Sequence, residues 1–198
     1  TLDRVSDAMG SIEESSWTRV SRALIKGREP IPRLDELLDT WPDLRVNIDV
    51  KADSAVTATV AAIERARAHD RVLISSFSDR RRRDVVTRLS APVASSAGRR
   101  VGAGFVTGGV LPGRMSDRAV SRVLRDVDAL QVPLAQYRVP IVTAASVQAA
   151  HRAGRVVHVW TINDAPTMHR LLDLGVDGLV TDRADVLKDV LIERGQWA

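Results

Sequence analysis

The chain has 198 residues, of which 44% are hydrophobic and 27% are charged. This length supports one sizeable core, and the composition is that of a globular protein, which excludes an intrinsically disordered chain. The absence of cysteine excludes disulfides and cysteine-ligated zinc. The formal charge of +4 does not require an anionic partner, so we expect no nucleic acid as a binding partner.

The sequence also lacks the marks of a membrane protein. No apolar run approaches the roughly 20 residues that cross a bilayer. The opening stretch TLDRVSDAMG has no basic start followed by an apolar segment, as a signal peptide would. We therefore expect no transmembrane segment and a cytoplasmic location.

From residue 45 onward, short β-rich runs alternate with helical patterns. Helix spacing of apolar residues and helix-ending signals follow most of the strand-like runs. The helical patterns cover 55–70, 79–89, 143–154, 164–175 and 183–195. The predicted strands are 45–51, 71–77, 92–96, 127–133, 156–162 and 177–181.

Several residues mark helix ends. Gly154 is placed as a C-terminal cap, and Asp164 as an N-terminal cap with Pro166 in the first turn. Asp182, or Thr181 beside it, is predicted to cap the last helix. The arginine-rich run DRRRRD at 79–84 could contact phosphates, but its position before VVTRL favours the solvated first turns of a helix.

Residues 91–113 allow two interpretations. Either APVASS contains the strand and a glycine-rich helix follows over about 97–109, or RVGAGFVTGG is itself the strand. The glycines of VGAGFVTGG do not have the G-x-G-x-x-G spacing of a dinucleotide-binding loop. We therefore expect no nucleotide site there, and six strands under either interpretation.

Strand, helix and strand in repetition, with near-continuous apolar strands, predict an α/β fold with a parallel sheet. Nothing in the composition divides residues 1–198, so we expect a single domain. Six parallel strands fit either a doubly wound sheet or an incomplete eight-stranded barrel.

Function in such folds collects at the carboxyl ends of the strands. Asp49 and Lys51 are two residues apart in RVNIDVK, so they share one face of the strand. RVNIDVK is predicted to be a short buried strand, and buried charges must be paired or bound, so the two residues are either a structural ion pair or part of a site. The other polar or aromatic residues at predicted strand ends are Ser75 to Phe77, Ser95, Ser96, Gln131, Trp160, Asn163, Thr181 and Asp182.

Trp160 is either a core residue or a residue of the site, where its indole could pack on the carbons of a ligand. The four histidines are poor catalytic candidates. His69, His151 and His169 lie in helical patterns, and His158 lies in the middle of a strand.

In order along the chain, several segments resemble the glycerophosphodiester phosphodiesterase family. The stretches that carry the resemblance are TLDRV, GREPIPRLDELLD, RVNIDVK, VLISSF, DALQVP, HVWTIND and LGVDGLVTD, and they run from residue 1 to about 190. Each alone is weak, but their joint order is specific. The resemblance implies a TIM-type (β/α)8 barrel, here with about six βα units.

The resemblance also implies a reaction and a site. The family hydrolyses glycerophosphodiesters to glycerol 3-phosphate and an alcohol in lipid and glycerol metabolism, with a divalent cation, Ca²⁺ or Mg²⁺. By resemblance Asp49 is a metal ligand, at a position where the family usually has Glu. Lys51 neutralises the phosphate, Trp160 lines the glycerol side, and Phe77 is a further lining residue.

The sequence departs from the family at its start. Family members carry a His-Arg-Gly strand, a Glu-x-Asp strand and a His-Asp turn upstream of the TLDRV-like segment, which supply the acid/base histidines and two metal carboxylates. The sequence has no His-Arg-Gly and no Glu-x-Asp, and its one His-Asp pair, at 69–70, lies far downstream of TLDRV. We therefore expect the first two strands and the catalytic histidines to be absent, and this chain alone to be inactive. It is then either a fragment of an active enzyme or a naturally shortened protein.

Three hypotheses follow: a metal-dependent phosphodiesterase, a non-catalytic binding or interaction module on a truncated barrel, and a sphingomyelinase-type phospholipase, which lacks the support of a membrane-binding loop. An open sheet would expose two edges, so we also expect self-association.

Overall fold

The computed structural model describes residues 1–106, 116–136 and 139–197. Its framework is a row of six parallel strands, all of which the sequence predicts, so the α/β class is confirmed. The strands are β3 (Val46–Asp49), β4 (Val72–Ser75), β5 (Ala94–Ser95), β6 (Ala129–Pro133), β9 (Val156–Trp160) and β10 (Gly178–Leu179).

The row is built from two three-stranded sheets. One runs β3, β4, β5 and the other runs β6, β9, β10, with every pairing parallel. A parallel bridge between Ser96 and Ala129 joins β5 to β6. Within the described ranges no strand pairs with the outer edge of β3 or β10, so the row is open at both ends.

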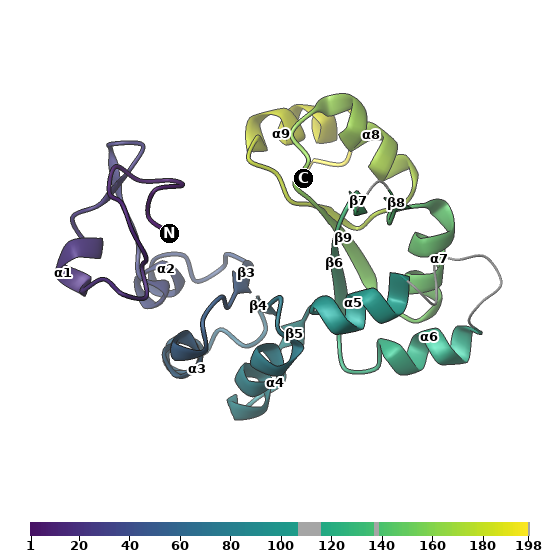
Figure 1. The fold of residues 1–198 in the computed structure, drawn as a ribbon. Coiled ribbons are helices and arrows are strands. Elements are labelled where there is room, and N and C mark those ends of the chain that lie inside the picture. Colours follow the sequence, from purple (N-terminus) through teal and green to yellow (C-terminus); the bar gives the residue numbers. More distant parts are fainter. Residues whose placement is uncertain (107–115, 137–138, 198) are drawn as a thin grey trace.

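Helices follow the strands, as expected for a parallel sheet. The helices are α3 (Val56–Ala66), α4 (Asp79–Arg88), α5 (Arg99–Phe105), α6 (Asp117–Val123), α7 (Ala144–Arg152), α8 (Ala165–Asp173) and α9 (Ala184–Glu193). Of these, α5, α6 and α7 lie around β6 and β9, with α8 and α9 beyond them, as Figure 1 shows. A 3-10 turn, η1 (Asp53–Ala55), precedes α3, and a small antiparallel pair, β7 (Ala135–Gln136) and β8 (Val139–Pro140), follows β6.

Residues before 45 form elements that the sequence patterns did not predict. Helices α1 (Trp17–Val20) and α2 (Leu34–Thr40) flank an antiparallel hairpin of β1 (Leu24–Ile25) and β2 (Glu29–Pro30). Its turn contains Lys26 and Gly27, with φ of 51° and 69°. The Lys-Gly pair is a weaker hairpin signal than Asn-Gly, because a lysine rarely adopts a positive φ.

Two predicted helix ends are confirmed and one is wrong. The Asp164 carboxylate accepts a hydrogen bond from the Thr167 amide at 2.9 Å, and Gly154 follows α7 with φ of 71°. Asp182 does not cap α9. Its carboxylate instead accepts a hydrogen bond from the Asn163 amide at 3.3 Å, and Arg183 occupies the cap position without a side-chain hydrogen bond.

The ambiguous glycine-rich stretch is helix α5, so the strand interpretation of RVGAGFVTGG is wrong; its residues 107–109 lie outside the described ranges. The helix is held by a residue from elsewhere. Asp79 is buried, and its carboxylate accepts hydrogen bonds from the Gly98 and Arg100 amides, both at 2.9 Å. A Cβ at position 98 would lie 2.7 Å from Asp79 Cγ, so only glycine allows this approach.

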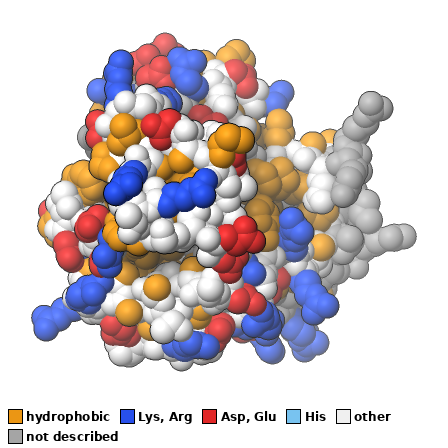
Figure 2. Space-filling model, turned by 60° about the vertical axis from the view of Figure 1, so that its left-hand side comes forward, with side chains coloured by type: hydrophobic (Ala, Val, Ile, Leu, Met, Phe, Trp, Pro, Cys, Tyr) orange, Lys and Arg blue, Asp and Glu red, His pale blue; other side chains and the backbone are white. Residues whose placement is uncertain are grey.

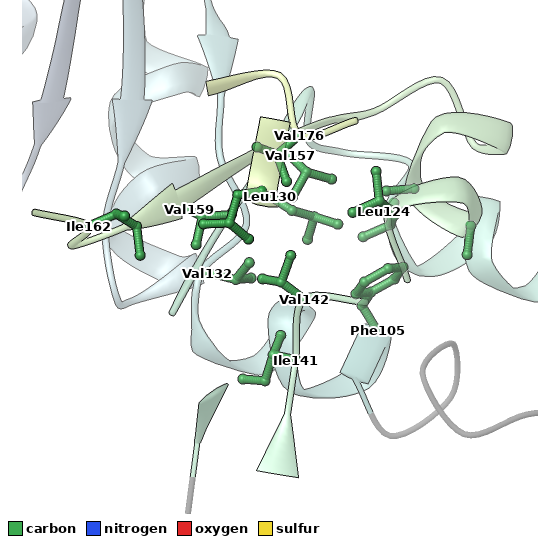
Figure 3. Packing of buried hydrophobic residues seen from close by; sticks show 14 of the residues in the cluster. Phe105, Leu124, Leu130, Val132, Ile141, Val142, Val157, Val159, Ile162 and Val176 are labelled. Carbon is green, nitrogen blue, oxygen red and sulfur yellow. The ribbon is translucent and has the colours of Figure 1, made fainter. Parts of the chain in front are cut away.

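The core has two parts, one under each sheet. The first packs β3 and β4 against α2, α3 and α4 through residues such as Leu38, Ile63 and Ile74. The second packs β6 and β9 against α5 to α9. In Figure 3 the side chains of this second cluster converge from both strands and from Phe105 of α5. Both clusters lie on the same side of the sheet row, because alternate residues of each strand point to the helices.

Arg82 links the two halves of the sheet. Its side chain is 2% exposed and donates hydrogen bonds to Ser95 Oγ at 3.0 Å and to the Asp126 carbonyl at 2.8 Å. Burial lowers the pKa of this guanidinium. The run at 79–84 therefore begins a helix as predicted, but it is only partly solvated, since Asp79 and Arg82 are both buried.

The surface mixes charges of both signs with apolar groups on the face that Figure 2 presents. No helix in the described part of the chain has the length and apolar character to cross a membrane.

Candidate functional site

The side of the sheet row opposite the helices is the face on which the polar strand residues gather. Strand register places Asp49 beside Ser75 and Gln131 beside His158, with Trp160 two residues beyond His158 on the same face. A cleft of about 300 Å³ opens at the carboxyl ends of these strands. We call it the strand-end cleft; among the residues that line it are Asn47, Asp49, Lys51, Ser75, Phe77, Ser96, Gln131, Trp160 and Val180.

Asp49 and Lys51 form an ion pair at one end of this cleft, so the predicted shared face is confirmed. The sequence suggested a buried strand, and this is wrong. Residues of β3 alternate between half-buried and exposed, and the side chains of Asp49 and Lys51 are 35% and 70% exposed. The pair is solvated because the face that would be a barrel interior is open in this structure.

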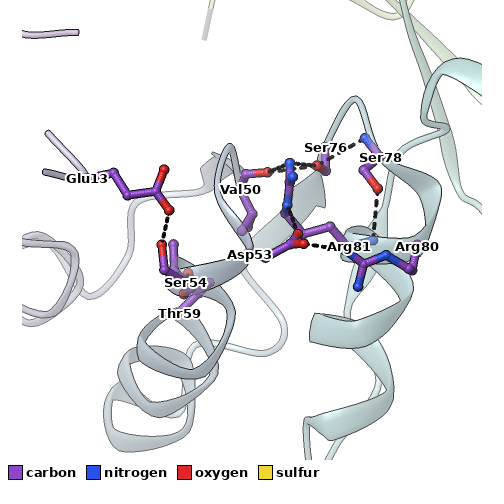
Figure 4. A network of polar contacts seen from close by, with 10 residues as sticks. Glu13, Val50, Asp53, Ser54, Thr59, Ser76, Ser78, Arg80 and Arg81 are labelled. Atoms are coloured by element: carbon purple, nitrogen blue, oxygen red, sulfur yellow. Dashed lines mark hydrogen bonds and ion pairs between the residues drawn. The ribbon is translucent and has the colours of Figure 1, made fainter. Parts of the chain in front are cut away.

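The segment that carries Lys51 is fixed by α4 and by the N-terminal region. Arg81 donates to the Val50 carbonyl at 3.3 Å and to Asp53 Oδ1 at 2.6 Å, and Arg80 also pairs with Asp53. Ser54 donates to Glu13 at 2.6 Å. Figure 4 shows Arg81 reaching from its helix across the end of β3. These contacts hold the backbone on both sides of Lys51.

Phe77 and Trp160 form the aromatic part of the cleft lining. Their ring centroids are 6.2 Å apart with planes at 80°, an edge-to-face contact. The Arg99 guanidinium lies 4.8 Å from the centroid of Phe77, and the Arg99 amide donates to the Phe77 carbonyl at 3.0 Å. Phe77 is still 51% exposed, so it retains apolar surface for a ligand.

Ser96 and Gln131 line the cleft from the end of β5 and from β6. Ser96 is fully buried, and its hydroxyl has no hydrogen-bond partner among the described residues although it lines the cleft. Gln131 Nε2 is 3.4 Å from His158 Nδ1. A hydroxyl without a partner in a cleft is a group that a ligand can satisfy.

His158 lies on the same face, in the layer beneath Trp160. Burial lowers the pKa of its imidazole, with Asp177 opposing this effect. Its neighbour on β10 is Gly178, where a Cβ would lie 2.8 Å from His158 Cδ2. The glycine in VDGLVTD therefore makes room for this ring.

A second, larger cleft of about 670 Å³ adjoins the first. We call it the α5 cleft, because α5 forms one wall and β6 the other. It shares Phe77, Ala97, Gln131 and Trp160 with the strand-end cleft. The two clefts therefore meet at the aromatic pair.

The structure separates some residues that the sequence grouped together. Ser95 is not in either cleft, because it faces the helices and binds Arg82. Asn163, Thr181 and Asp182 bind one another instead of lining a cleft, with Thr181 Oγ1 donating to Asn163 at 3.0 Å. His69 is not helical, since α3 ends at Ala66.

Sequence reasoning missed three residues of this region. Asn47 could have been found from its spacing of two before Asp49. His158 was placed in its strand correctly but not on the face of the cleft. Arg99 carried no signal, because it follows a strand that was itself uncertain.

The cleft does not fit a complete metal centre on its own. Asp49 is the one acidic side chain among the described residues that line it, and it is paired with Lys51. No group of three His, Cys, Asp or Glu residues in the described ranges is arranged to hold a metal ion. Ca²⁺ takes six to eight oxygen ligands and Mg²⁺ six, so these residues offer one carboxylate to such an ion.

Comparison with known proteins gives consistent matches over most of the chain. Residues 1–186 match the model of the "Glycerophosphoryl diester phosphodiesterase family". A Mycobacterium tuberculosis relative, named a probable glycerophosphodiester phosphodiesterase 2, is 47% identical over 95% of this chain and 70% of its own length.

Two solved structures share the fold. The Agrobacterium tumefaciens glycerophosphodiester phosphodiesterase has a TM-score of 0.69 at 17% identity, over 96% of this chain and 77% of that one. An Oleispira antarctica phosphodiesterase, solved with the product sn-glycerol-3-phosphate, has a TM-score of 0.67 at 17% identity, over 96% and 76%.

Proposed function

The chain belongs to the glycerophosphoryl diester phosphodiesterase family, and we propose that its strand-end cleft binds the glycerol phosphate half of a glycerophosphodiester. Enzymes of this family that carry the full catalytic set would hydrolyse this substrate to glycerol 3-phosphate and an alcohol. The observation that carries the proposal is the presence of the Lys51 ammonium and the Phe77–Trp160 aromatic pair in one cleft.

The cleft suits a ligand that is anionic at one end and carbon-rich at the other. The Lys51 ammonium is exposed and can form a charge-assisted hydrogen bond with a phosphate oxygen. The aromatic faces can pack on the glycerol carbons. Ser96 and Gln131, which also line the cleft, can hydrogen-bond the glycerol hydroxyls.

Asp49 is proposed as one ligand of a divalent cation, Ca²⁺ or Mg²⁺. A carboxylate suits such a hard cation, which when bound would offset charge on the phosphate. The remaining ligands are not among the described residues that line the cleft. Calorimetric titration of Ca²⁺ into the wild type and Asp49→Asn tests the assignment, and equal heats for both proteins would contradict it.

We further propose that this chain by itself binds the substrate without cutting it. Hydrolysis of the diester needs a group that donates a proton to the leaving alcohol. No histidine is among the described residues that line the strand-end cleft. This observation also supports the alternative of a non-catalytic binding module.

The decisive experiment is calorimetric titration with glycerol 3-phosphate, which needs no turnover. Lys51→Met should weaken binding about tenfold or more, because a charge-assisted hydrogen bond contributes about 1.5–3 kcal/mol. The matched control is Lys188→Met, since Lys188 lies on α9 beside Trp197 and outside both clefts. Absence of binding, or equal loss in both variants, would show that the cleft is not the site.

A second assay separates binding from catalysis. The chain is incubated with a glycerophosphodiester, with and without a chelator, and released glycerol 3-phosphate is measured. No release is expected. Release that the chelator abolishes would refute the proposed inactivity of this chain and support a metal-dependent enzyme.

A further inference from the structure

We propose that the α5 cleft receives the alcohol half of the substrate, and that Arg99 selects against alcohols that carry a positive charge. The inference rests on the proposed function, because it assumes that glycerol phosphate occupies the strand-end cleft. It goes further by assigning the neighbouring cleft and a class of alcohol.

The position of the α5 cleft is the first argument. It adjoins the strand-end cleft and shares Phe77, Gln131 and Trp160 with it. A diester whose phosphate lies near Lys51 would continue past the two rings into this space. The volume of about 670 Å³ is larger than the roughly 300 Å³ of the strand-end cleft, so it can hold a bulky group.

The walls of the α5 cleft are the second argument. On the α5 side Gly98 and Gly102 present backbone without side chains, and on the β6 side Leu130 and Val132 present apolar carbons. Gln131 and Gln136 supply uncharged hydrogen-bonding groups. Such walls suit a neutral alcohol that has both carbons and hydroxyls.

The charge of the α5 cleft is the third argument. Arg99 is exposed and lines this cleft. Its guanidinium forms no ion pair with a carboxylate of the described residues. No acidic side chain lines the cleft among the described residues. A cationic alcohol would therefore meet a like charge with no carboxylate to offset it.

The ring of Phe77 does not reverse this preference. A quaternary ammonium group is commonly held over the face of an aromatic ring. The Arg99 guanidinium already occupies this position over Phe77, with 4.8 Å to the ring centroid. The hydrogen bond from the Arg99 amide to the Phe77 carbonyl keeps the two residues together. Neutral polyol alcohols are thus favoured over choline-like ones.

The test compares three ligands by calorimetry, with no divalent cation added: glycerol 3-phosphate, glycerophosphoglycerol and glycerophosphocholine. The wild type should bind glycerophosphoglycerol about three- to tenfold more tightly than glycerophosphocholine, the size expected for one repulsive charge at the edge of a solvated cleft. Arg99→Gln should bring the affinities for the two diesters to within about twofold of each other.

Arg100→Gln is the matched control, because Arg100 is the next arginine on α5, is exposed and does not line the α5 cleft. It should keep the wild-type preference. If glycerol 3-phosphate binds but the wild type does not prefer the neutral diester, or if Arg99→Gln keeps the preference, the inference is overturned while the proposed function stands. If none of the three ligands binds, both are overturned.

Discussion

Phe77 and Trp160 meet edge to face across the two halves of the sheet, with ring centroids 6.2 Å apart. Phe77 follows β4 and Trp160 ends β9, and β5 and β6 lie between these strands in the row. The two strands pack on separate hydrophobic clusters. The ring contact is therefore a direct link between the two halves at the site.

The first prediction concerns this link. A double-mutant cycle with Phe77→Ala and Trp160→Ala should give a coupling of about 0.5–1 kcal/mol in the free energy of unfolding, measured by urea denaturation, because edge-to-face pairs contribute this much beyond burial. Pairing Phe77→Ala with Trp197→Ala should be additive, since Trp197 packs on Lys188 instead. Additivity in the first cycle would mean that the rings touch without stabilising each other.

The second prediction concerns the unpaired hydroxyl of Ser96. Ser96→Ala should leave the free energy of unfolding unchanged or raise it by up to about 1 kcal/mol, because no hydrogen bond to a described residue is lost. The affinity for glycerol 3-phosphate should fall about fivefold, which corresponds to one lost hydrogen bond. Urea denaturation and calorimetry give the two values.

Ser95→Ala is the matched comparison for Ser96, and it should show the opposite pattern. The Ser95 hydroxyl accepts the hydrogen bond from buried Arg82 and lies outside both clefts. Its loss should cost about 1–2 kcal/mol of stability and leave ligand affinity unchanged. The same pattern in both variants would remove Ser96 from the binding site.

The third prediction concerns Arg82. Arg82→Met should lower the free energy of unfolding by about 2–4 kcal/mol, because the Asp126 carbonyl and the Ser95 hydroxyl lose their buried donor. Arg83→Met, the neighbouring exposed position, should change it by about 0.5 kcal/mol or less. Urea denaturation measures both, and equal stabilities would mean that Arg82 is not needed to join α4 to β5.

The fourth prediction is a pH dependence from His158. Burial holds its pKa in the folded state below 6.5, so below that pH the unfolded chain takes up a proton that the folded chain does not. Its contribution to stability is therefore present above 6.5 and is lost as the pH falls from 6.5 toward the folded pKa. The loss between pH 7.5 and 5.5 should be smaller in His158→Gln than in the wild type. The other three histidines are common to both proteins, so they do not contribute to the difference. Identical losses of stability in the two proteins would show that the protonation of His158 is not coupled to folding.

The order of the strand and helix units could be predicted because its signals are local. The spacing of apolar residues indicated the six strands and the helices that follow most of these strands. Asp164 and Gly154 indicated two helix ends. The shared face of Asp49 and Lys51 followed from the period of a strand. The roles of these two residues as metal ligand and phosphate-binding residue remain predictions, as do those of Phe77 and Trp160.

The remaining features depend on contacts between segments far apart in the chain. The sequence alone determined which residues stand at each strand end, because two-residue periodicity is a property of the backbone. The tertiary structure decided that Ser96 faces the cleft while Ser95 faces Arg82, because strand register sets which neighbour each residue meets. It also placed Arg99 over Phe77 and the Asp79 carboxylate at the start of α5. No local pattern encodes these meetings, since each joins groups from separate elements whose approach is fixed by packing.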